Sequence, residues 1–371
     1  MKLFEYMGKD LFRQYGIPTP KGKVIRTAGE AGPVTEELGN VVIKTQILSG
    51  KRGKAGGIKF ADQSSDAIEA ANSILGKEFN GLVAEEVLIE EKLPIEKELY
   101  LAIVMEGSLR GPILLASQYG GMDIEEVPEA NIIKMPIDIH VGIQPYLCRE
   151  IARKLELTGD IQQQFSKMLP NLYRLFKERD CEMVEINPLV IADGKLVAAD
   201  AKITIDDEAL YRQPDLPKVE ERNEAEQKAH AIGLSFVQLD GDIAIMANGA
   251  GITMATLDVI NHYGGSPANF LDAGGGANVE QTAAALELLL STNPKAIFIN
   301  IFGGITRCDD VARAFLQVNS QKSIDVPVVI RLVGTNQEAG VKLLQEQGIV
   351  AYEHMQEAAM KTVALAKGMV E

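Results

Sequence analysis

The chain has 371 residues, of which 46% are apolar and 24% are charged, and its formal net charge is −15. This composition is typical of a soluble globular protein, and the length is enough for two domains, because single cores stop growing near about 250 to 300 residues. The negative charge argues against a nucleic-acid partner, since nucleic acids are bound by basic surfaces, and no apolar run approaches the roughly 20 residues that span a membrane.

Two further features bear on where the protein works. The opening residues, MKLFEYMGKDLF, contain acids and lack the apolar stretch of a secretory signal. Cys148, Cys181 and Cys308 are scattered and odd in number, which suits reduced core thiols better than disulfides or a zinc site. We therefore expect a cytoplasmic protein with no membrane or nucleic-acid partner.

The first half of the chain mixes helices and strands. We expect helices at residues 4–15, 65–75, 148–155 and around 162–178, a strand at 40–46, and a strand-rich stretch at 82–121. This pattern favours an α+β fold with antiparallel strands. Residues 211–229 contain two prolines and many charges, so we place the domain linker there and expect domains at 1–225 and 226–371.

A positively charged segment begins at the strand at 40–46. Lys44 lies in an apolar run, where burial is unfavourable unless its ammonium group meets an anion. The loop that follows contains Lys51, Arg52 and Gly53, and such flexible, basic backbone can close over phosphates. Its spacing is not that of a P-loop. A solvated basic turn remains the alternative.

A break in the next strand-rich stretch carries acids on both sides. Glu90 precedes the break at Pro94, and Glu98 follows it. Such an edge can offer backbone groups to an adenine and a carboxylate to a ribose, although acids at these places can also be simply solvated.

Residues 184–203 predict a hairpin around an Asp-Gly turn, the strongest short hairpin signal. A two-residue turn sets Asn187 opposite Asp200 and Glu185 opposite Lys202, all on one face. Facing residues have Cβ atoms about 4.5 to 5.5 Å apart, so the amide and the carboxylate can share a Mg²⁺, which takes one or two protein oxygens. An ordinary surface with a Glu185–Lys202 ion pair is the alternative.

From about residue 229 the chain repeats an apolar strand, a glycine turn and a helix, which indicates βαβ units on a parallel sheet. Glycine turns at 248–251, 274–276 and 303–306 each end a strand and open a helix, and such turns suit phosphate or carboxylate. Turn geometry alone is the alternative. None of the four histidines has the setting of a nucleophile.

In chain order, the motifs EYMGKDLFRQYGIPTPKG, VIKTQ with GKRGKAGG, EKELYL, VEINPLV, LYRQPDL, NGAG, NFLDAGGGA and NIFGGITRCD resemble the β subunits of succinyl-CoA synthetases, also called succinate–CoA ligases. The resemblance covers essentially the whole chain. It implies an N-terminal ATP-grasp domain followed by a flavodoxin-like parallel-sheet domain, an α+β fold followed by an α/β fold. At Pro20 the chain resembles the family members that use adenine nucleotides, so an ADP-forming enzyme is expected rather than a GDP-forming one.

The resemblance also implies a reaction of the citric acid cycle. Mg-ATP would exchange a phosphoryl group with a histidine on an α subunit, which also carries most of the CoA site, so that succinate and CoA form succinyl-CoA with release of ADP and phosphate. Two alternatives are a β subunit of malate–CoA ligase or another NDP-forming acid–CoA ligase, and a non-catalytic subunit that senses nucleotide or CoA.

Individual roles follow from the same resemblance. One Mg²⁺ per β subunit would be held by Asn187 and Asp200, and Glu185 would face the phosphohistidine as the catalytic residue. The residues implied to bind nucleotide are Lys44, Lys51, Arg52, Gly53, Glu90, Leu93 and Glu98. Those implied to bind substrate at the second site, where succinyl phosphate forms and CoA attacks, are Asn248, Gly304, Ile305 and Thr306.

Overall fold

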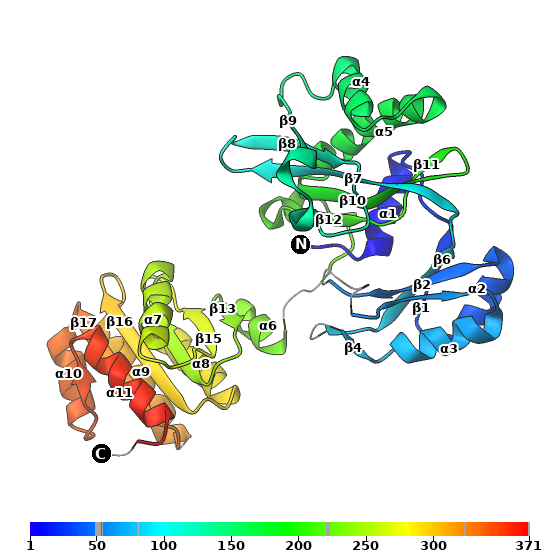
Figure 1. The fold of residues 1–371 in the computed structure, drawn as a ribbon. Coiled ribbons are helices and arrows are strands. Elements are labelled where there is room, and N and C mark those ends of the chain that lie inside the picture. The colour runs from blue at the N-terminus through cyan, green and yellow to red at the C-terminus, as the bar shows by residue number, and fades with distance from the viewer. Residues whose placement is uncertain (49–52, 54, 80–81, 220–222, 323, 370–371) are drawn as a thin grey trace. The chain divides into compact units, whose positions relative to one another are not determined.

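A computed structural model describes residues 1–48, 53, 55–79, 82–219, 223–322 and 324–369. The chain forms two compact units, Met1–Glu221 and Arg222–Glu371 (Figure 1). Lys51 and Arg52, two of the predicted nucleotide residues, lie outside the described residues.

The smaller sheet of the first unit is antiparallel and places Lys44 and Glu90 on one face. Its strands, in the order β1-β6-β2-β3, are β1 (Gly22–Ile25), β6 (Glu86–Glu91), β2 (Val41–Gln46) and β3 (Ile58–Ala61). Helices α2 (Ala31–Leu38) and α3 (Ser64–Ile74) cover the opposite face and enclose an apolar core that includes Ile43 and Ile89. A two-stranded sheet, β4 (Glu78–Phe79) with β5 (Leu82–Val83), follows α3.

The larger sheet of the first unit carries the predicted hairpin. Its strands, in the order β11-β10-β7-β8-β9, are β11 (Lys195–Ala198), β10 (Cys181–Ala192), β7 (Ile95–Glu106), β8 (Gly111–Ser117) and β9 (Ile133–Pro136), and β12 (Lys202–Ile205) also pairs with β10. Helices α1 (Glu5–Gln14), α4 (Pro145–Lys154) and α5 (Gly159–Glu178) supply apolar residues to the core of this sheet. The short 3₁₀ helices are η1 (Ala28–Glu30), η2 (Ile124–Glu126), η3 (Glu129–Asn131) and η4 (Asp207–Arg212).

The second unit is a doubly wound sheet. Its strands, in the order β13-β15-β14-β16-β17-β18, are β13 (Ser235–Gln238), β15 (Asn269–Asp272), β14 (Ile243–Ala247), β16 (Ala296–Gly303), β17 (Val328–Gly334) and β18 (Ala351–Tyr352). All pair in parallel except β13, which runs antiparallel to β15. From β15 to β18 the order is that of flavodoxin-like folds.

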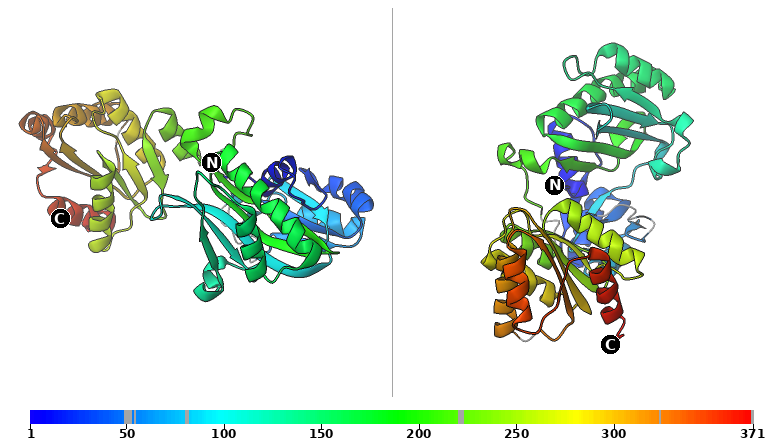
Figure 2. Two further views of the ribbon diagram at one scale, coloured as in Figure 1. Left: turned by 90° about the horizontal axis from the view of Figure 1, so that it is seen from above. Right: turned by 90° about the vertical axis from the view of Figure 1, so that its left-hand side faces the viewer.

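Helices cover both faces of this second sheet (Figures 1 and 2). Helices α7 (Ala250–His262) and α11 (Met355–Ala366) share one apolar core with it. Helices α6 (Glu224–Ala231), α8 (Val279–Ser291), α9 (Cys308–Gln321) and α10 (Gln337–Gln345) contribute to the core on the other face. The carboxyl ends of the parallel strands therefore share one edge, where the three glycine turns lie.

The predicted fold class is confirmed, and the predicted helices of the first half agree with α1, α3, α4 and α5 to within a few residues. The charged segment at 211–229 contains more regular structure in its described residues than its composition suggests. Its last part forms α6, because Asn223 and Glu226 make a capping box that satisfies free N–H groups at the helix start. The antiparallel edge strand β13 is a further element that the strand-turn-helix repeat does not predict.

The three cysteines are free and buried, as predicted. Within the described part of the chain, no helix combines the length and the apolar character needed to cross a membrane.

Candidate functional site

The hairpin has the predicted register. Its strands pair Ala192 with Lys195 beside the turn and Glu185 with Lys202 farther out. Asn187 and Asp200 lie between the β10–β11 ladder, which ends at Leu189, and the β10–β12 ladder, which begins at Glu185. Asn187 and Asp200 thus occupy a gap in strand pairing between the two ladders.

The Asn187 amide is fixed by the loop that follows β8. Its Oδ1 accepts a hydrogen bond from the Gly121 N–H at 2.8 Å, and its Nδ2 donates to the Met122 carbonyl at 2.9 Å. Gly121 has φ +72°, and a Cβ on it would collide with the carboxylate of Glu98. The loop therefore brings Glu98, a predicted nucleotide residue, next to Asn187, a predicted metal ligand.

Glu185 is a partly buried carboxylate in the middle of β10. Burial raises the pKa of Glu185 and the Asp200 carboxylate raises it further, while Lys202 opposite and hydrogen bonds from Tyr100 and Asn187 lower it, and the net shift is upward. The Tyr100 hydroxyl lies 3.4 Å from Glu185 Oε2. A carboxyl group with a raised pKa between polar partners can exchange hydrogen bonds with an incoming imidazole.

A cluster of four charged side chains lies beside the hairpin. The ammonium groups of Lys9 and Lys44 both contact Glu5 Oε1, at 2.7 and 2.8 Å, and Glu90 Oε2, at 2.6 and 2.9 Å. Both also donate to the carbonyl oxygen of Ala199, at 2.8 and 2.7 Å. Two ammonium groups thus bridge the same three oxygen atoms. We call these four side chains the lysine–glutamate cluster.

The lysine–glutamate cluster explains why Lys44 can lie in an apolar run, because the Lys44 ammonium group contacts two carboxylates. Burial lowers the pKa of Lys44, but Glu5, Glu90 and Asp200 together outweigh burial and raise it. The pKa of Lys9 is lowered, because burial and the nearby Lys44 ammonium group outweigh the carboxylates. The carboxylate of Glu90 is engaged within the cluster and not offered to a ribose in this structure.

Sequence reasoning missed Glu5 and Lys9. They stand four residues apart on α1, and such i,i+4 pairs usually lie on an exposed helix face. The side chain of Lys9 is only 1% exposed. One signal in the sequence was available. Glu5 and Lys9 lie in the same helix as Leu11 and Phe12, which are buried in the core.

Two further predicted nucleotide residues, Gly53 and Leu93, lie near the smaller sheet. Gly53 is exposed, and its carbonyl accepts from the Gly56 N–H at 3.1 Å. Leu93 follows β6, and its carbonyl accepts from the Ile95 N–H at 3.0 Å. Near β1, a pocket of about 450 Å³ is lined by Pro20 among other residues.

In the second unit, side chains tie the three glycine turns together. Asp272 Oδ1 accepts hydrogen bonds from the Gly249 N–H at 2.5 Å and the Gly274 N–H at 2.7 Å. The Gly276 N–H donates to the hydroxyl of Thr306 at 3.0 Å, and Thr306 is buried. The turns therefore form one connected edge at the carboxyl ends of β14, β15 and β16.

Asn248 has a bridging role at the same edge. Its Nδ2 donates to the Phe302 carbonyl, and its Oδ1 accepts from the Phe302 N–H, both at 2.9 Å. Gly304 has open space where a Cβ would be, and Ile305 is 81% exposed. The 304–306 turn thus offers exposed backbone and an exposed apolar side chain, held in place by Thr306 and Asn248.

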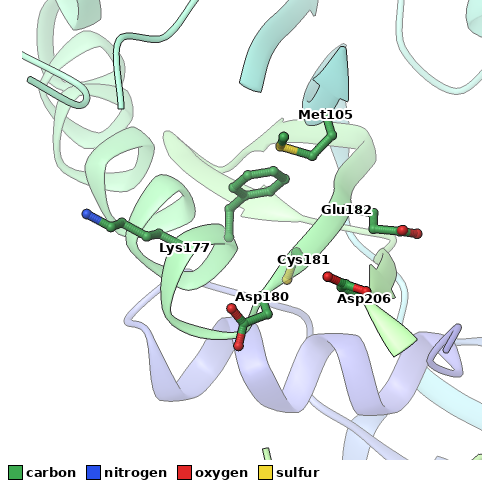
Figure 3. Close-up of a pocket in the computed structure, with 7 residues that line it drawn as sticks. Met105, Lys177, Asp180, Cys181, Glu182 and Asp206 are labelled. Atoms are coloured by element: carbon green, nitrogen blue, oxygen red, sulfur yellow. The ribbon is translucent and has the colours of Figure 1, made fainter. Parts of the chain in front are cut away.

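A larger pocket, of about 650 Å³, lies away from these residues. It opens between the end of α5 and the start of β10 (Figure 3). Its lining residues are Met105, Phe176, Lys177, Asp180, Cys181, Glu182 and Asp206. It contains none of the predicted site residues, and Asp180 is already paired with Arg212 at 2.7 Å.

No group of three or more His, Cys, Asp or Glu that could hold a metal ion is found among the described residues. The predicted pair of Asn187 and Asp200 is a smaller set of hard oxygen donors. Mg²⁺ characteristically binds to one or two protein oxygens together with water and substrate phosphates.

Two family models match the chain. Residues 2–191 match the ATP-grasp domain, and residues 246–366 match the CoA-ligase domain. In fold, the chain is similar to an ATP citrate lyase from Methanothrix soehngenii, with a TM-score of 0.74 at 21% identity over 99% of each chain.

Curated relatives match the whole chain at higher identity. The succinate–CoA ligase [ADP-forming] subunit beta of Nautilia profundicola is 44% identical, covering 99% of this chain and 100% of the relative. Those of Chloroflexus aurantiacus and Staphylothermus marinus are 45% and 42% identical, over 99% and 100% of this chain. The resemblance found in the sequence motifs is confirmed, and the chain belongs to the family of β subunits of ADP-forming succinate–CoA ligases.

Proposed function

We propose that this chain binds Mg-ATP in its first unit and exchanges a phosphoryl group with a histidine of an α subunit. Succinate, CoA and ATP then give succinyl-CoA, ADP and phosphate, reversibly. The observation that carries the proposal is the hairpin, whose register aligns Asn187, Asp200 and Glu185 at a gap in strand pairing beside two lysines. The free, buried thiols suit a reducing compartment, so a cytoplasmic location is part of the proposal.

The residues at the gap fit a magnesium ion. Asn187 Oδ1 has one hydrogen bond from Gly121 and retains a second lone pair. Asp200 Oδ1 accepts from the Ala201 N–H at 2.7 Å, and carboxylate oxygens are hard donors of the kind that Mg²⁺ prefers. Asn187 and Asp200 would hold the ion, which neutralises phosphate charge when it is bound.

The positive groups of the first unit would bind the phosphates. Lys44 is the better placed of the two cluster lysines, because its side chain is 12% exposed whereas that of Lys9 is 1% exposed. Lys51, Arg52 and Gly53 would cover the phosphates as a basic loop, and Glu90, Leu93 and Glu98 would line the nucleotide site. Glu90 would act from within the lysine–glutamate cluster, because its carboxylate is engaged by Lys9 and Lys44.

Glu185 would receive the partner's histidine. Its raised pKa keeps the carboxyl group ready to share a proton or a hydrogen bond with an imidazole ring. The described histidines of this chain lie in a turn, in α6 and α7, and at the start of α11. We propose, as the family resemblance implies, that the phosphorylated histidine belongs to the α subunit.

The turns of the second unit would serve the second half of the reaction. Gly304 and Ile305 are exposed in the turn that leads into α9, and turns before a helix favour phosphate or carboxylate. Asn248 and Thr306 hold that backbone in position. We propose that succinyl phosphate forms here, with the α subunit supplying most of the CoA site.

The test is phosphorylation of the α subunit in the co-expressed complex, with ³²P-labelled ATP and Mg²⁺. Asn187→Ala and Asp200→Ala should each abolish labelling of the partner's histidine, whereas Glu182→Gln, an exposed change on the same strand, should not. Labelling that persists in both alanine variants would refute the assigned metal site. Absence of labelling in the unaltered complex, with nucleotide still bound, would support the sensing alternative.

Acid specificity is tested in the same complex. The names of the relatives favour succinate over malate. Succinate should support CoA- and ATP-dependent thioester formation more efficiently than malate, judged by kcat/KM. Malate active with succinate inert would make the chain a subunit of a malate–CoA ligase.

A further inference from the structure

Lys9 is a buried lysine that the proposed chemistry does not use. Its ammonium group contacts four oxygen atoms within 2.8 Å: Glu5 Oε1, both carboxylate oxygens of Glu90, and the Ala199 carbonyl. A buried ammonium group is stable only where anions and hydrogen-bond acceptors surround it. Lys9 therefore has a specific environment, built from α1, β6 and the segment between β11 and β12.

The chain makes room for this environment. In the smaller sheet Glu90 pairs with Gly22 on one side and with Val42 on the other. A Cβ on Gly22 would lie 2.6 Å from Glu90 Cγ, so only glycine leaves space for the Glu90 side chain. Lys44 is two residues along β2 from Val42 and is thus a diagonal neighbour of Glu90 on the same face.

Every oxygen that Lys44 contacts is also contacted by Lys9. The three donors of the Lys44 ammonium group are matched by three acceptors, which are Glu5 Oε1, Glu90 Oε2 and the Ala199 carbonyl. To reach a phosphate, Lys44 must give up at least one of them. Lys9 would still neutralise the two carboxylates and hold the Ala199 carbonyl, so none of these oxygens would be left without a cation.

We propose that Lys9 is a positioning residue for nucleotide binding. It is the counter-cation that stays beside Glu5 and Glu90, which lets Lys44 move between these carboxylates and the nucleotide phosphates. It also anchors Ala199, the residue before Asp200, while Lys44 is engaged elsewhere. This inference rests on the proposed function, in which Lys44 contacts phosphate and Asp200 binds Mg²⁺.

A purely structural role of the lysine–glutamate cluster predicts different effects of substitutions on nucleotide binding. If the four charges only stabilise the fold, then loss of any one of them should weaken binding through distortion. If charge balance controls Lys44, the affinity for nucleotide falls or rises according to which charge is removed. Without Lys9, two carboxylates hold Lys44 and repel the phosphates. Without the Glu5 charge, one carboxylate fewer restrains Lys44.

The experiment measures binding of Mg-ADP to the purified full-length chain by isothermal titration calorimetry. Lys9→Met should raise Kd by about tenfold or more, since it leaves buried carboxylates undercompensated. Glu5→Gln should leave Kd unchanged or lower it, and Lys9→Met with Glu5→Gln should recover most of the lost affinity. Lys154→Met is the matched control, because it removes an exposed lysine from another i,i+4 pair, with Glu150 at 3.3 Å, and should have no effect.

Each outcome separates the two proposals. Glu5→Gln binding as weakly as Lys9→Met, or a double variant weaker than Lys9→Met, would overturn the role of Lys9. If Lys9→Met does not fold, the Kd of Glu5→Gln for Mg-ADP decides between the two explanations. Only the charge-balance mechanism predicts that this variant binds no more weakly than the unaltered chain. If Lys44→Met binds Mg-ADP as tightly as the unaltered chain, the proposed function fails at Lys44, whatever the other variants do.

Discussion

The side-chain oxygen of Asn187 accepts a hydrogen bond from the backbone N–H of Gly121 at 2.8 Å. The amide is thereby oriented, because its nitrogen donates to the neighbouring Met122 carbonyl. Groups that orient a metal ligand commonly affect metal affinity almost as much as the ligand itself. The loop after β8 is therefore part of the proposed magnesium site through its hydrogen bonds to Asn187.

Gly121→Ala should accordingly weaken the response to Mg²⁺. Gly121 has φ +72°, and its Cβ would meet the Glu98 carboxylate, so the loop must shift and the Asn187 amide loses its N–H partner. We expect the Mg²⁺ concentration for half-maximal histidine phosphorylation to rise by about 10- to 100-fold. Gly107→Ala, in an open turn with nothing near the added Cβ, is the control. An unchanged Mg²⁺ dependence would show that the loop does not orient Asn187.

Glu185→Gln should stabilise the chain while impairing phosphoryl transfer. A pKa raised above the ordinary 4.5 means that the folded chain holds this proton more tightly than the unfolded chain. Ionised Glu185 therefore lowers stability above its folded-state pKa and has no such effect below 4.5, where both states are protonated. Tm should rise at neutral pH, and the gain should vanish as the pH falls to about 4.5.

The rate of transfer to the partner's histidine should fall by about 100-fold or more in the same variant. Glu182→Gln, exposed on the same strand, provides the control for both measurements. A stability difference from the unaltered chain that does not change with pH would show that the pKa of Glu185 is not raised in the folded chain.

Asp309→Asn should destabilise the second unit in a pH-dependent way. Hydrogen bonds from Arg307 chiefly lower the pKa of Asp309, with Arg313 and Asn336 assisting and burial opposing them. A lowered pKa gives stability that is present above the ordinary value of 3.8 and is lost as the pH falls through the folded-state pKa. Thermal unfolding of Asp309→Asn should therefore show its full loss at neutral pH and a smaller loss below pH 3.8.

Asn248→Ala tests whether Asn248 acts through Phe302. The change removes two hydrogen bonds to the Phe302 backbone and should reduce stability by about 1 to 3 kcal/mol. Asn261→Ala, at an exposed position of α7, should change stability by less than about 0.5 kcal/mol. A loss of CoA-dependent activity with no loss of stability would instead make Asn248 a direct ligand.

The sequence predicted best those features that local periodicity controls. The Asp-Gly turn fixed the pairing of Glu185 with Lys202, and the strand-turn-helix repeat predicted the parallel sheet and its shared glycine edge. The predicted first residues of α4 and α5 differ from the observed ones by three positions, because capping and packing decide where a helix begins.

Features that depend on distant segments were not predicted. Lys9 and Glu90 are 81 positions apart, and Lys9 and Ala199 are 190 apart. The burial of Lys9 depends on the fold, which brings the smaller sheet against that face of α1. The hydrogen bond from Gly121 to Asn187 spans 66 positions and likewise depends on tertiary structure.

The antiparallel strand β13 has a consequence for how the gene can be divided. Together with α6 it belongs to the core of the second unit, through Ala229, Leu234 and Phe236, and it pairs the edge of β15 that would otherwise be open. Open edges promote aggregation of isolated domains. A polypeptide starting at Asn223 would bring its own helix cap and its own edge strand, so the second half of the coding sequence is suited to separate expression.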